Sequence, residues 1–405
     1  MSLLDQTARR DGGRIVAALA AAFRDLDLAE EAYAEACARA AAVWPAAPPL
    51  DPAAWLYAVA RRYALDMIRR RNMRRANALE PPAPPPTAED ILTADDRLIP
   101  DERLRLIFVC CHPSVAPEAR AALTLRLVCG LSVAEIARAF LVAEPAMFQR
   151  LTRAKKKIAQ AGVSFEVPGP EAWPGRMAAV LSTLEVAYAR AHEDAAGSGP
   201  HAGYAREMLD LTAVLTGLAP GDPEALAFAA LVRFAEARRP ARLDPDGAMI
   251  PLAEQDPKLW NRALIAEGEA LLRRAARLNR PGPRQLRAAL HGAWALRRSL
   301  AEPPPWATLL ALYDLLLQEG DDPFVRLNRA VALAELAGPA AALAEVEALD
   351  ADRLERFQPY HAVRADLLAR LGRADEALRA YDRAIEMAPG EAERLWLIRR
   401  RMMSP

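Results

Sequence analysis

Proline divides this sequence into blocks and so limits which segments can form continuous helices. The stretch 80–87 is EPPAPPPT, and it cannot lie inside a helix, because proline lacks a backbone N–H and its ring clashes with the preceding turn. We expect an extended spacer there. Further prolines in 167–175, VPGPEAWPG, make a second break. The sequence therefore predicts three folded parts, at 10–77, 99–161 and 176–402, joined by linkers at 78–98 and 162–175.

All three parts place apolar residues at helical spacing rather than in the alternation that is typical of strands. Aromatic residues make up only 6% of the 405 residues, whereas alanine and leucine are abundant, and this favours helices over strands. A chain of this length has room for about two to four domains. We therefore predict an all-α fold.

The third part repeats itself at an offset of 35 residues. The matching pairs are Ala330 and Ala365, Leu333 and Leu368, Leu336 and Leu371, Ala342 and Ala377, Leu343 and Leu378, and Val346 and Tyr381. This pattern resembles a tetratricopeptide unit, in which small residues lie where two helices cross. It is clearest in 323–391, and 260–298 indicates a further helical pair. We expect a C-terminal helical array that binds proteins or packs on its neighbours.

A helix-turn-helix is predicted in 118–158. Helical spacing of apolar residues ends at Gly130, and Ser132 with Glu135 then forms the Ser-x-x-Glu pattern of a capping box. Pro145 suits the first turn of the next helix, which continues through three consecutive lysines. Such a helix can enter the major groove of DNA, although an ordinary helical pair with a solvated basic end gives the same pattern. Because the whole chain has only four lysines, their concentration here favours DNA binding.

A second basic segment lies in 51–75. Asp51 can cap a helix that begins at Pro52, and the helix ends in a dense run of arginines with aromatic residues among them. Aromatic rings can stack on unpaired bases while guanidinium groups bind phosphates, which suits melted DNA. The alternative is a solvated basic helix end, and for Trp55 alone a place in the core is the more ordinary interpretation.

An acidic amphipathic helix is predicted before it, at 27–39. Its acidic face suits a protein partner rather than DNA. Taken by itself it would be a surface helix.

These three segments, in this order, resemble a bacterial RNA polymerase sigma factor of the extracytoplasmic-function group, which retains sigma domains 2 and 4. The acidic segment matches the family pattern at Asp27, Ala29, Glu30, Glu31, Glu35, Arg39 and Ala40. The basic segment matches at Pro52, Ala54, Trp55, Leu56, Val59, Ala60, Arg61, Ala64, Leu65, Asp66, Arg69, Arg70 and Arg71. The helix-turn-helix matches at Leu131, Glu135, Ile136, Ala137, Met147, Arg150, Leu151, Arg153, Ala154 and Lys157. The motif at 103–113, with the long helical extension, resembles the subgroup that has a C-terminal tetratricopeptide-like domain.

The resemblance implies a role for each segment. Binding of core RNA polymerase is expected from Asp27, Glu30, Glu31, Glu35 and Arg39. Contact with the promoter −10 element is expected from Trp55, Arg61, Arg62, Tyr63, Arg69, Arg70 and Arg71. Contact with the −35 element is expected from Ala146, Phe148, Gln149, Arg150, Arg153, Lys156 and Lys157. Ala146 and Phe148 replace the family's usual polar side chains, so thymine methyl groups are their expected contacts.

No catalytic residue, metal site or cofactor is predicted. Cys110-Cys111-His112 lacks a second pair of ligands, and adjacent cysteines seldom bind one zinc ion. We therefore expect these residues at a buried helix end. The four cysteines show no CxxC spacing, and the chain has neither a signal-type apolar segment nor an apolar run long enough to cross a membrane. A cytoplasmic protein without a membrane partner is expected.

The formal net charge is zero, with 53 basic and 53 acidic residues. This sum combines an acidic segment for polymerase with basic segments for promoter DNA, so it does not exclude DNA binding. The sequence predicts a sigma factor, not an enzyme, whose C-terminal array folds back on domains 2 and 4 or binds a protein regulator. One alternative is a helix-turn-helix regulator with a protein-binding array that acts without core polymerase. The other is a scaffold whose basic helices are merely surface.

Overall fold

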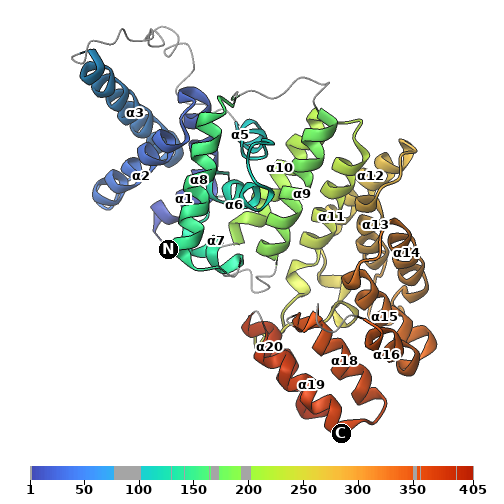
Figure 1. Cartoon of the computed structure of the whole chain (residues 1–405). Helices are drawn as coiled ribbons and strands as arrows, with labels where there is room; N and C mark the ends of the chain where they lie inside the picture. Colours follow the sequence, from blue (N-terminus) through green and yellow to red (C-terminus); the bar gives the residue numbers. More distant parts are fainter. Residues whose placement is uncertain are drawn as a thin grey trace. The chain divides into compact units, whose positions relative to one another are not determined.

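Helices make up most of the structure, a computed structural model (Figure 1). It describes residues 2–76, 102–128, 130–140, 142–163, 165, 173–192, 202–349, 354–355, 357–388 and 390–404. The predicted linker 78–98 and most of 162–175 lie outside the described residues. The described part contains no β-strand. It has an isolated β-bridge between Leu243 and Met249. The prediction of an all-α fold is confirmed.

The chain divides into two compact units, Met1–Ala191 and His192–Pro405. The helices of the first unit are α1 (Leu3–Phe23), α2 (Leu26–Val43), α3 (Pro52–Ala76), α5 (Arg103–Cys110), α6 (Pro117–Leu127), α7 (Val133–Ala139), α8 (Glu144–Gln160) and α9 (Trp173–His192). The first three pack on one another, and α1 also packs on α5 and α6. The two predicted sigma domains are thus in direct contact within this unit.

Local sequence signals set the helix ends of the first unit. Asp51 Oδ1 accepts a hydrogen bond from the backbone N–H of Ala54 at 3.0 Å, as expected for a cap before Pro52. Ser132 and Glu135 form the predicted capping box, with bonds of 3.2 and 2.7 Å. Gly130 has a φ of +69°, a conformation that glycine adopts without strain, and so turns the chain from α6 into α7.

The crossing of α1 and α2 depends on one glycine. A Cβ atom on Gly12 would lie 2.6 Å from the hydroxyl oxygen of Tyr33. That hydroxyl is buried, beside the thiol of Cys37. Burial raises the pKa of Tyr33, so the side chain stays neutral and protonated. The ring therefore occupies the space that only a glycine leaves open.

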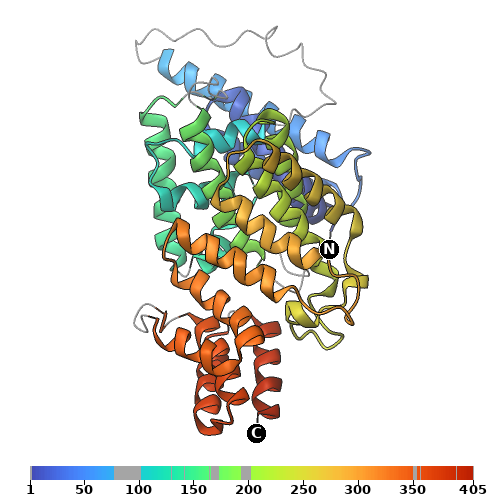
Figure 2. The same cartoon turned by 90° about the vertical axis from the view of Figure 1, so that its right-hand side faces the viewer.

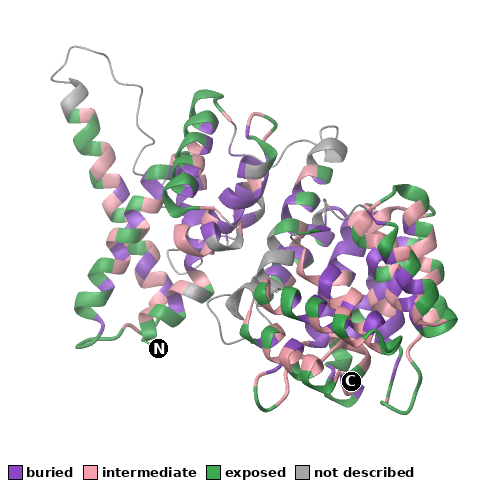
Figure 3. Cartoon of the chain, turned by 60° about the horizontal axis from the view of Figure 1, so that its bottom comes forward, coloured by how far each residue is buried: buried purple, intermediate pink, exposed green. Residues whose placement is uncertain are grey.

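The second unit is a series of helices stacked in pairs (Figure 2). They are α10 (Ala202–Leu218), α11 (Pro223–Ala237), α12 (Arg262–Arg277), α13 (Pro283–Ala295), α14 (Trp306–Glu319), α15 (Pro323–Ala337), α16 (Pro339–Glu347), α18 (Gln358–Arg370), α19 (Ala374–Glu386) and α20 (Glu391–Met403). Three short 3-10 helices, η2 (Arg239–Ala241), η3 (Leu252–Glu254) and η4 (Pro257–Leu259), lie between α11 and α12. Buried residues gather on the facing sides of the helices (Figure 3).

The internal repeat corresponds to two of these helix pairs, α15 with α16 and α18 with α19. The small residues predicted at the crossings are fully buried, at 0% exposure for Ala330, Ala342, Ala365 and Ala377. The predicted pair in 260–298 corresponds to α12 and α13. Helix pairing at these positions agrees with the sequence, whereas the boundaries of the three predicted domains stay predictions.

Replacing Gly12 by alanine should destabilise the first unit, because the Tyr33 ring has to move out of a packed crossing. We expect a loss of about 1–2 kcal/mol, or a fall of about 2–8 °C in the midpoint of thermal unfolding. Differential scanning calorimetry of the full chain measures it. Gly217→Ala is the control, because an added Cβ there meets nothing within 4 Å and should slightly raise stability. An equal effect of the two substitutions would contradict the role given to Gly12.

Candidate polymerase and nucleic-acid interface

The predicted DNA-reading helix α8 has one buried face and one solvent-facing basic stripe. Its buried residues are Met147, Leu151, Ala154 and Ile158. The opposite side presents the predicted −35 residues, which are exposed at Ala146, Phe148, Gln149, Arg153, Lys156 and Lys157 and half-buried at Arg150. Ala146, Gln149, Arg150, Arg153, Lys156 and Lys157 are spaced by three or four residues and form one stripe. Phe148 is 61% exposed beside this stripe.

Lys155 differs from the two lysines that follow it. Its Nζ atom lies 2.5 Å from Asp27 Oδ1 and 2.9 Å from Glu30 Oε2, both on the acidic helix α2. The side chains of Lys155 and Glu30 are only 18% and 17% exposed, whereas that of Asp27 is 72% exposed. Lys155 therefore joins the region of the helix-turn-helix to the predicted polymerase-binding helix.

Arg126 of α6 holds the same acidic residue from a second side. Its Nε atom donates to Glu30 Oε1 at 2.7 Å, and its Nη1 atom donates to the carbonyl oxygen of Leu131 at 3.0 Å. Both carboxylate oxygens of Glu30 thus accept from cations of the 103–160 segment. We call the four residues Asp27, Glu30, Arg126 and Lys155 the α2 latch.

The ammonium group of Lys155 is charged in the latch at neutral pH. Burial alone would lower the pKa of Lys155, but its hydrogen bond to Asp27 and the charge and hydrogen bond of Glu30 outweigh burial and raise that pKa. A raised pKa in the folded state means that the ammonium stabilises the unit at neutral pH. This contribution is lost only as the pH rises through the raised pKa.

The other predicted polymerase-binding residues face α3 or solvent. Glu31 Oε1 accepts a hydrogen bond from the Tyr63 hydroxyl at 3.0 Å, and this bond raises the pKa of Tyr63. Glu35 pairs with Arg39 one helical turn later, at 2.8 Å. The structure therefore places all five residues on α2. Asp27 and Glu30 contact Lys155 and Arg126, Glu31 contacts Tyr63, and Glu35 pairs with Arg39.

The predicted −10 residues lie along α3. Arg62, Arg69, Arg70 and Arg71 are exposed, and Arg61 and Tyr63 are half-buried. Arg71 lies 3.3 Å from Asp25, which also caps α2. Trp55 is half-buried and packs edge-on against buried Trp44, with 5.5 Å between ring centroids. Trp55 is thus part of the packing, but its ring is still partly exposed to solvent.

The Cys110-Cys111-His112 segment lies at a packed helix end. Both cysteines are buried at the end of α5, and the thiol of Cys111 lies 3.4 Å from the Thr183 hydroxyl of α9. His112 Nδ1 lies 2.7 Å from the Ser114 hydroxyl. Across the described ranges no group of His, Cys, Asp or Glu side chains is arranged to hold a metal ion.

Arg126 and Lys155 are the site residues that sequence reasoning missed. A signal for Lys155 exists, since it lies four residues after Leu151 and three before Ile158, next to the buried stripe rather than on the exposed one. Which partner it meets could not be predicted, because Asp27 lies 128 residues earlier in the chain.

Two family models match the chain. Residues 105–158, which cover α5 to α8, match sigma-70, region 4. Residues 176–276 match a family of unknown function (DUF6596). Residues 105–158 are thus similar to a sigma-70 region 4 domain, which is a transcription-factor type of domain rather than an enzyme family.

The chain is also 42% identical over 389 residues to an uncharacterized protein of Rhizobium meliloti (strain 1021), with 93% of this chain and 89% of that protein covered. It belongs to the same family as that protein. No solved structure matches the chain. Among the described helices, none is both long and apolar enough to cross a membrane.

The latch predicts a measurable coupling between Lys155 and Glu30. Lys155→Met and Glu30→Gln, made singly and together, should give a coupling free energy of about 1–2 kcal/mol, because the pair is largely shielded from water. Thermal unfolding of the full chain at neutral pH measures it. Lys156→Met combined with Glu30→Gln is the matched control and should show no coupling. Coupling that is equal for the two lysines would contradict the assignment.

Proposed function

We propose that the chain is a sigma factor of the extracytoplasmic-function group, which binds core RNA polymerase and directs it to promoters. The observation that carries the proposal is the exposed basic stripe of α8 within the region 4 match. Arg150, Arg153, Lys156 and Lys157 offer cations to phosphates and base edges of the −35 element. Phe148 and Ala146 would contact thymine methyl groups beside them.

The −10 element would lie along α3. The exposed arginines of this helix supply cations for phosphates, and the open part of the Trp55 ring offers a stacking surface for an unpaired base. The hydroxyl of Tyr63 is held by Glu31, so its ring rather than its oxygen is available for stacking.

The acidic face of α2 would bind core polymerase. In the first unit, however, Asp27 and Glu30 of that face already pair with Lys155 and Arg126. We propose that this closed arrangement is the resting state and that polymerase replaces the latch cations. The exposed stripe of α8 does not take part in the latch, so the two functions use different faces of one helix.

The C-terminal array is proposed as the regulator of this activity, acting by folding back or by binding a protein partner. Its support is covalent attachment of stacked helix pairs to a region 4 domain. Such arrays offer extended surfaces for partners.

Transcription by purified core polymerase tests the main proposal. We expect the full chain to start transcripts at specific sites on fragmented genomic DNA, and Arg150→Ala with Arg153→Ala to lower their yield by about 10- to 100-fold, since each lost contact costs about 1–3 kcal/mol. Sequencing of transcript 5′ ends gives the start sites. Arg273→Ala with Arg274→Ala, which removes two exposed arginines of α12, is the control.

Two outcomes would overturn it. Sequence-specific DNA binding without polymerase-dependent initiation would support a helix-turn-helix regulator instead. Binding to neither DNA nor polymerase would support a scaffold.

Opening of the latch has its own test. Lys155→Met should raise the affinity for core polymerase about fivefold, because it weakens a contact that competes with polymerase for α2. Glu31→Gln should not raise it, since Glu31 lies outside the latch. Fluorescence anisotropy of the labelled full chain measures both. An unchanged or lower affinity of the Lys155 variant would mean that the latch does not compete with polymerase.

A further inference from the structure

A groove on the surface of the second unit lies between η4, the first half of α12 and the end of α13. Its volume is about 580 Å³, which is in the range of ligand sites in proteins. The buried part of its lining is apolar and includes Ile265 and Ala295. The rest of the lining is mostly exposed, so the groove is open to a partner on the surface.

Cations dominate the charged lining of this groove. Lys258, Arg262 and Arg298 share it with a single carboxylate, that of Glu269. Among the residues that the structure describes, no carboxylate forms an ion pair with any of the three cations. Glu269, in contrast, pairs with Arg273 one helical turn later, at 3.5 Å. The groove therefore has a positive charge that ion pairs within the second unit do not neutralise.

Two other carboxylates near the groove accept hydrogen bonds from the backbone. Asp256 Oδ1 accepts from the N–H of Lys258 at 3.0 Å, and Glu302 Oε2 accepts from the N–H of Arg298 at 2.8 Å. Both bonds hold the main chain, and neither involves a side-chain cation. The ammonium group of Lys258 and the guanidinium group of Arg298 are thus available to a partner.

Arg262 fixes the shape of the groove. Its Nη atoms donate to the carbonyl oxygens of Pro257 at 2.9 Å, Ala295 at 3.3 Å and Arg297 at 3.1 Å. These bonds join η4 and the end of α13 to the first turn of α12. Carbonyl oxygens satisfy the donors of a guanidinium but do not cancel its charge. A site that is held in this way needs little reorganisation on binding.

An exposed leucine lies among these cations. Leu296 lines the groove and is 67% exposed, and Leu259, the neighbour of Lys258 in the chain, is 54% exposed. Protein interfaces combine apolar contacts with charged pairs at their rim. Nucleic acid is bound mainly through its phosphates, which would leave the leucines without an apolar contact. The mixture of leucines and cations therefore favours a protein segment that has leucines and carboxylates of its own.

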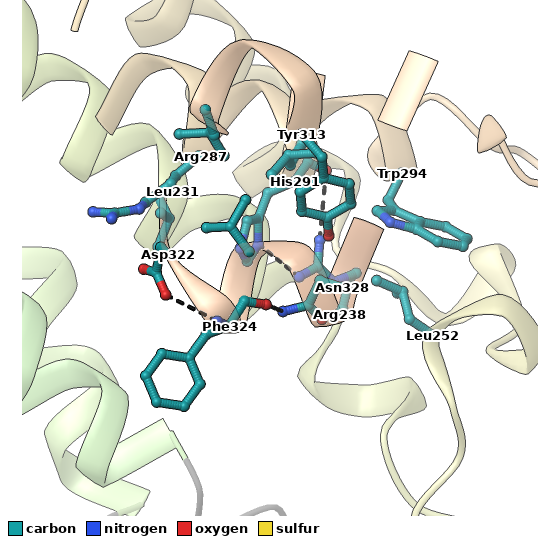
Figure 4. Close-up of a pocket in the computed structure, with 13 residues that line it drawn as sticks. Leu231, Arg238, Leu252, Arg287, His291, Trp294, Tyr313, Asp322, Phe324 and Asn328 are labelled. Atoms are coloured by element: carbon teal, nitrogen blue, oxygen red, sulfur yellow. Dashed lines mark hydrogen bonds between the residues drawn. The ribbon is translucent and has the colours of Figure 1, made fainter. Parts of the chain in front are cut away.

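A second pocket of this unit, between α11, α13, α14 and α15, differs in its polar groups (Figure 4). Arg238 Nη2 lies 2.8 Å from His291 Nδ1, and Asn328 Nδ2 donates to the carbonyl oxygen of Phe324 at 2.9 Å. Polar groups of that pocket bind one another, whereas the three cations of the open groove are exposed to solvent.

We propose that the groove between η4, α12 and α13 binds a short acidic segment of a partner protein, in which carboxylates lie next to leucines. The carboxylates pair with Lys258 and Arg298, and a leucine packs on Leu296 and Ala266. This proposal names a class of partner for the C-terminal array, so it rests on the proposed protein-binding role of that array. Its test needs neither polymerase nor promoter DNA, and its failure would leave the sigma-factor proposal intact.

Fluorescence anisotropy of the full chain with a labelled peptide tests the proposal. The probe is a short peptide in which pairs of leucines alternate with pairs of glutamates, and it should bind with a dissociation constant below about 100 μM. Replacing its glutamates by glutamine, or its leucines by serine, should weaken binding at least about fivefold. No binding, or equal binding of the acidic and the glutamine peptide, would overturn the proposal.

Variants locate the site. Lys258→Glu with Arg298→Glu should weaken binding of the acidic peptide at least about tenfold, and Leu296→Ser about fivefold. Arg274→Glu with Arg277→Glu is the matched control, since both arginines are exposed on α12 but do not line the groove. An equal loss of binding in this control would contradict the location.

Circular dichroism confirms that each variant is folded. If the double charge reversal is not folded, Lys258→Gln with Arg298→Gln replaces it and should weaken binding about threefold. Duplex DNA is the alternative ligand. A full chain that ignores the peptide, but loses affinity for duplex DNA when Lys258 and Arg298 are replaced, would have a phosphate site here instead.

Discussion

Close approach of helix backbones through alanine is the constraint on which the structure depends. On α2 the residues Ala29, Ala32, Ala36 and Ala40 are spaced by three or four and are all 0% exposed. Alanine loses no side-chain entropy on burial, but it also buries little apolar surface, so each crossing contributes little by itself. The helices therefore need both many crossings and additional contacts at their edges. Two other contacts also depend on small residues. Gly12 leaves room for the Tyr33 ring between α1 and α2, and the paired alanines let the helices of the repeat approach closely.

Ionic contacts supply those edge interactions, and helix geometry decides which charges are used in this way. Consecutive residues on a helix point about 100° apart, so Lys155, Lys156 and Lys157 cannot serve the same partner. Lys155 points toward α2 and its side chain is 18% exposed, whereas Lys156 and Lys157 are exposed. A chain with zero net charge can therefore hold its acidic and basic segments together and still keep a basic face outward. The zero net charge of the chain is thus compatible with ion pairs between acidic and basic segments inside the first unit.

Features encoded within a few residues could be predicted from the sequence, and pairings across the chain could not. The all-α class, the Asp51 cap, the capping box at Ser132 and the buried alanines of the repeat all follow from local spacing. The exposed stripe of α8 also follows from a spacing of three and four. In contrast, the latch joins residues 128 apart in the sequence, and its partners depend on how α2 and α8 pack. A pocket within the second unit likewise combines side chains from Leu231 to Asn328, each of which looks locally like an ordinary core or surface residue.

Burial separates arginines that hold this fold from arginines that are available to a partner. The abundance of arginine in the sequence says little by itself, because base composition of the coding DNA can produce it. Arg297 is 4% exposed and donates to the carbonyl oxygens of Ala253 and Glu302, so it fixes the connection between α13 and α14. Burial lowers its pKa, yet a guanidinium remains charged, and carbonyl acceptors compensate for the lost water. Arg153 of α8, in contrast, is exposed and donates to a backbone oxygen of its own helix, a bond that nucleic acid can replace at little cost.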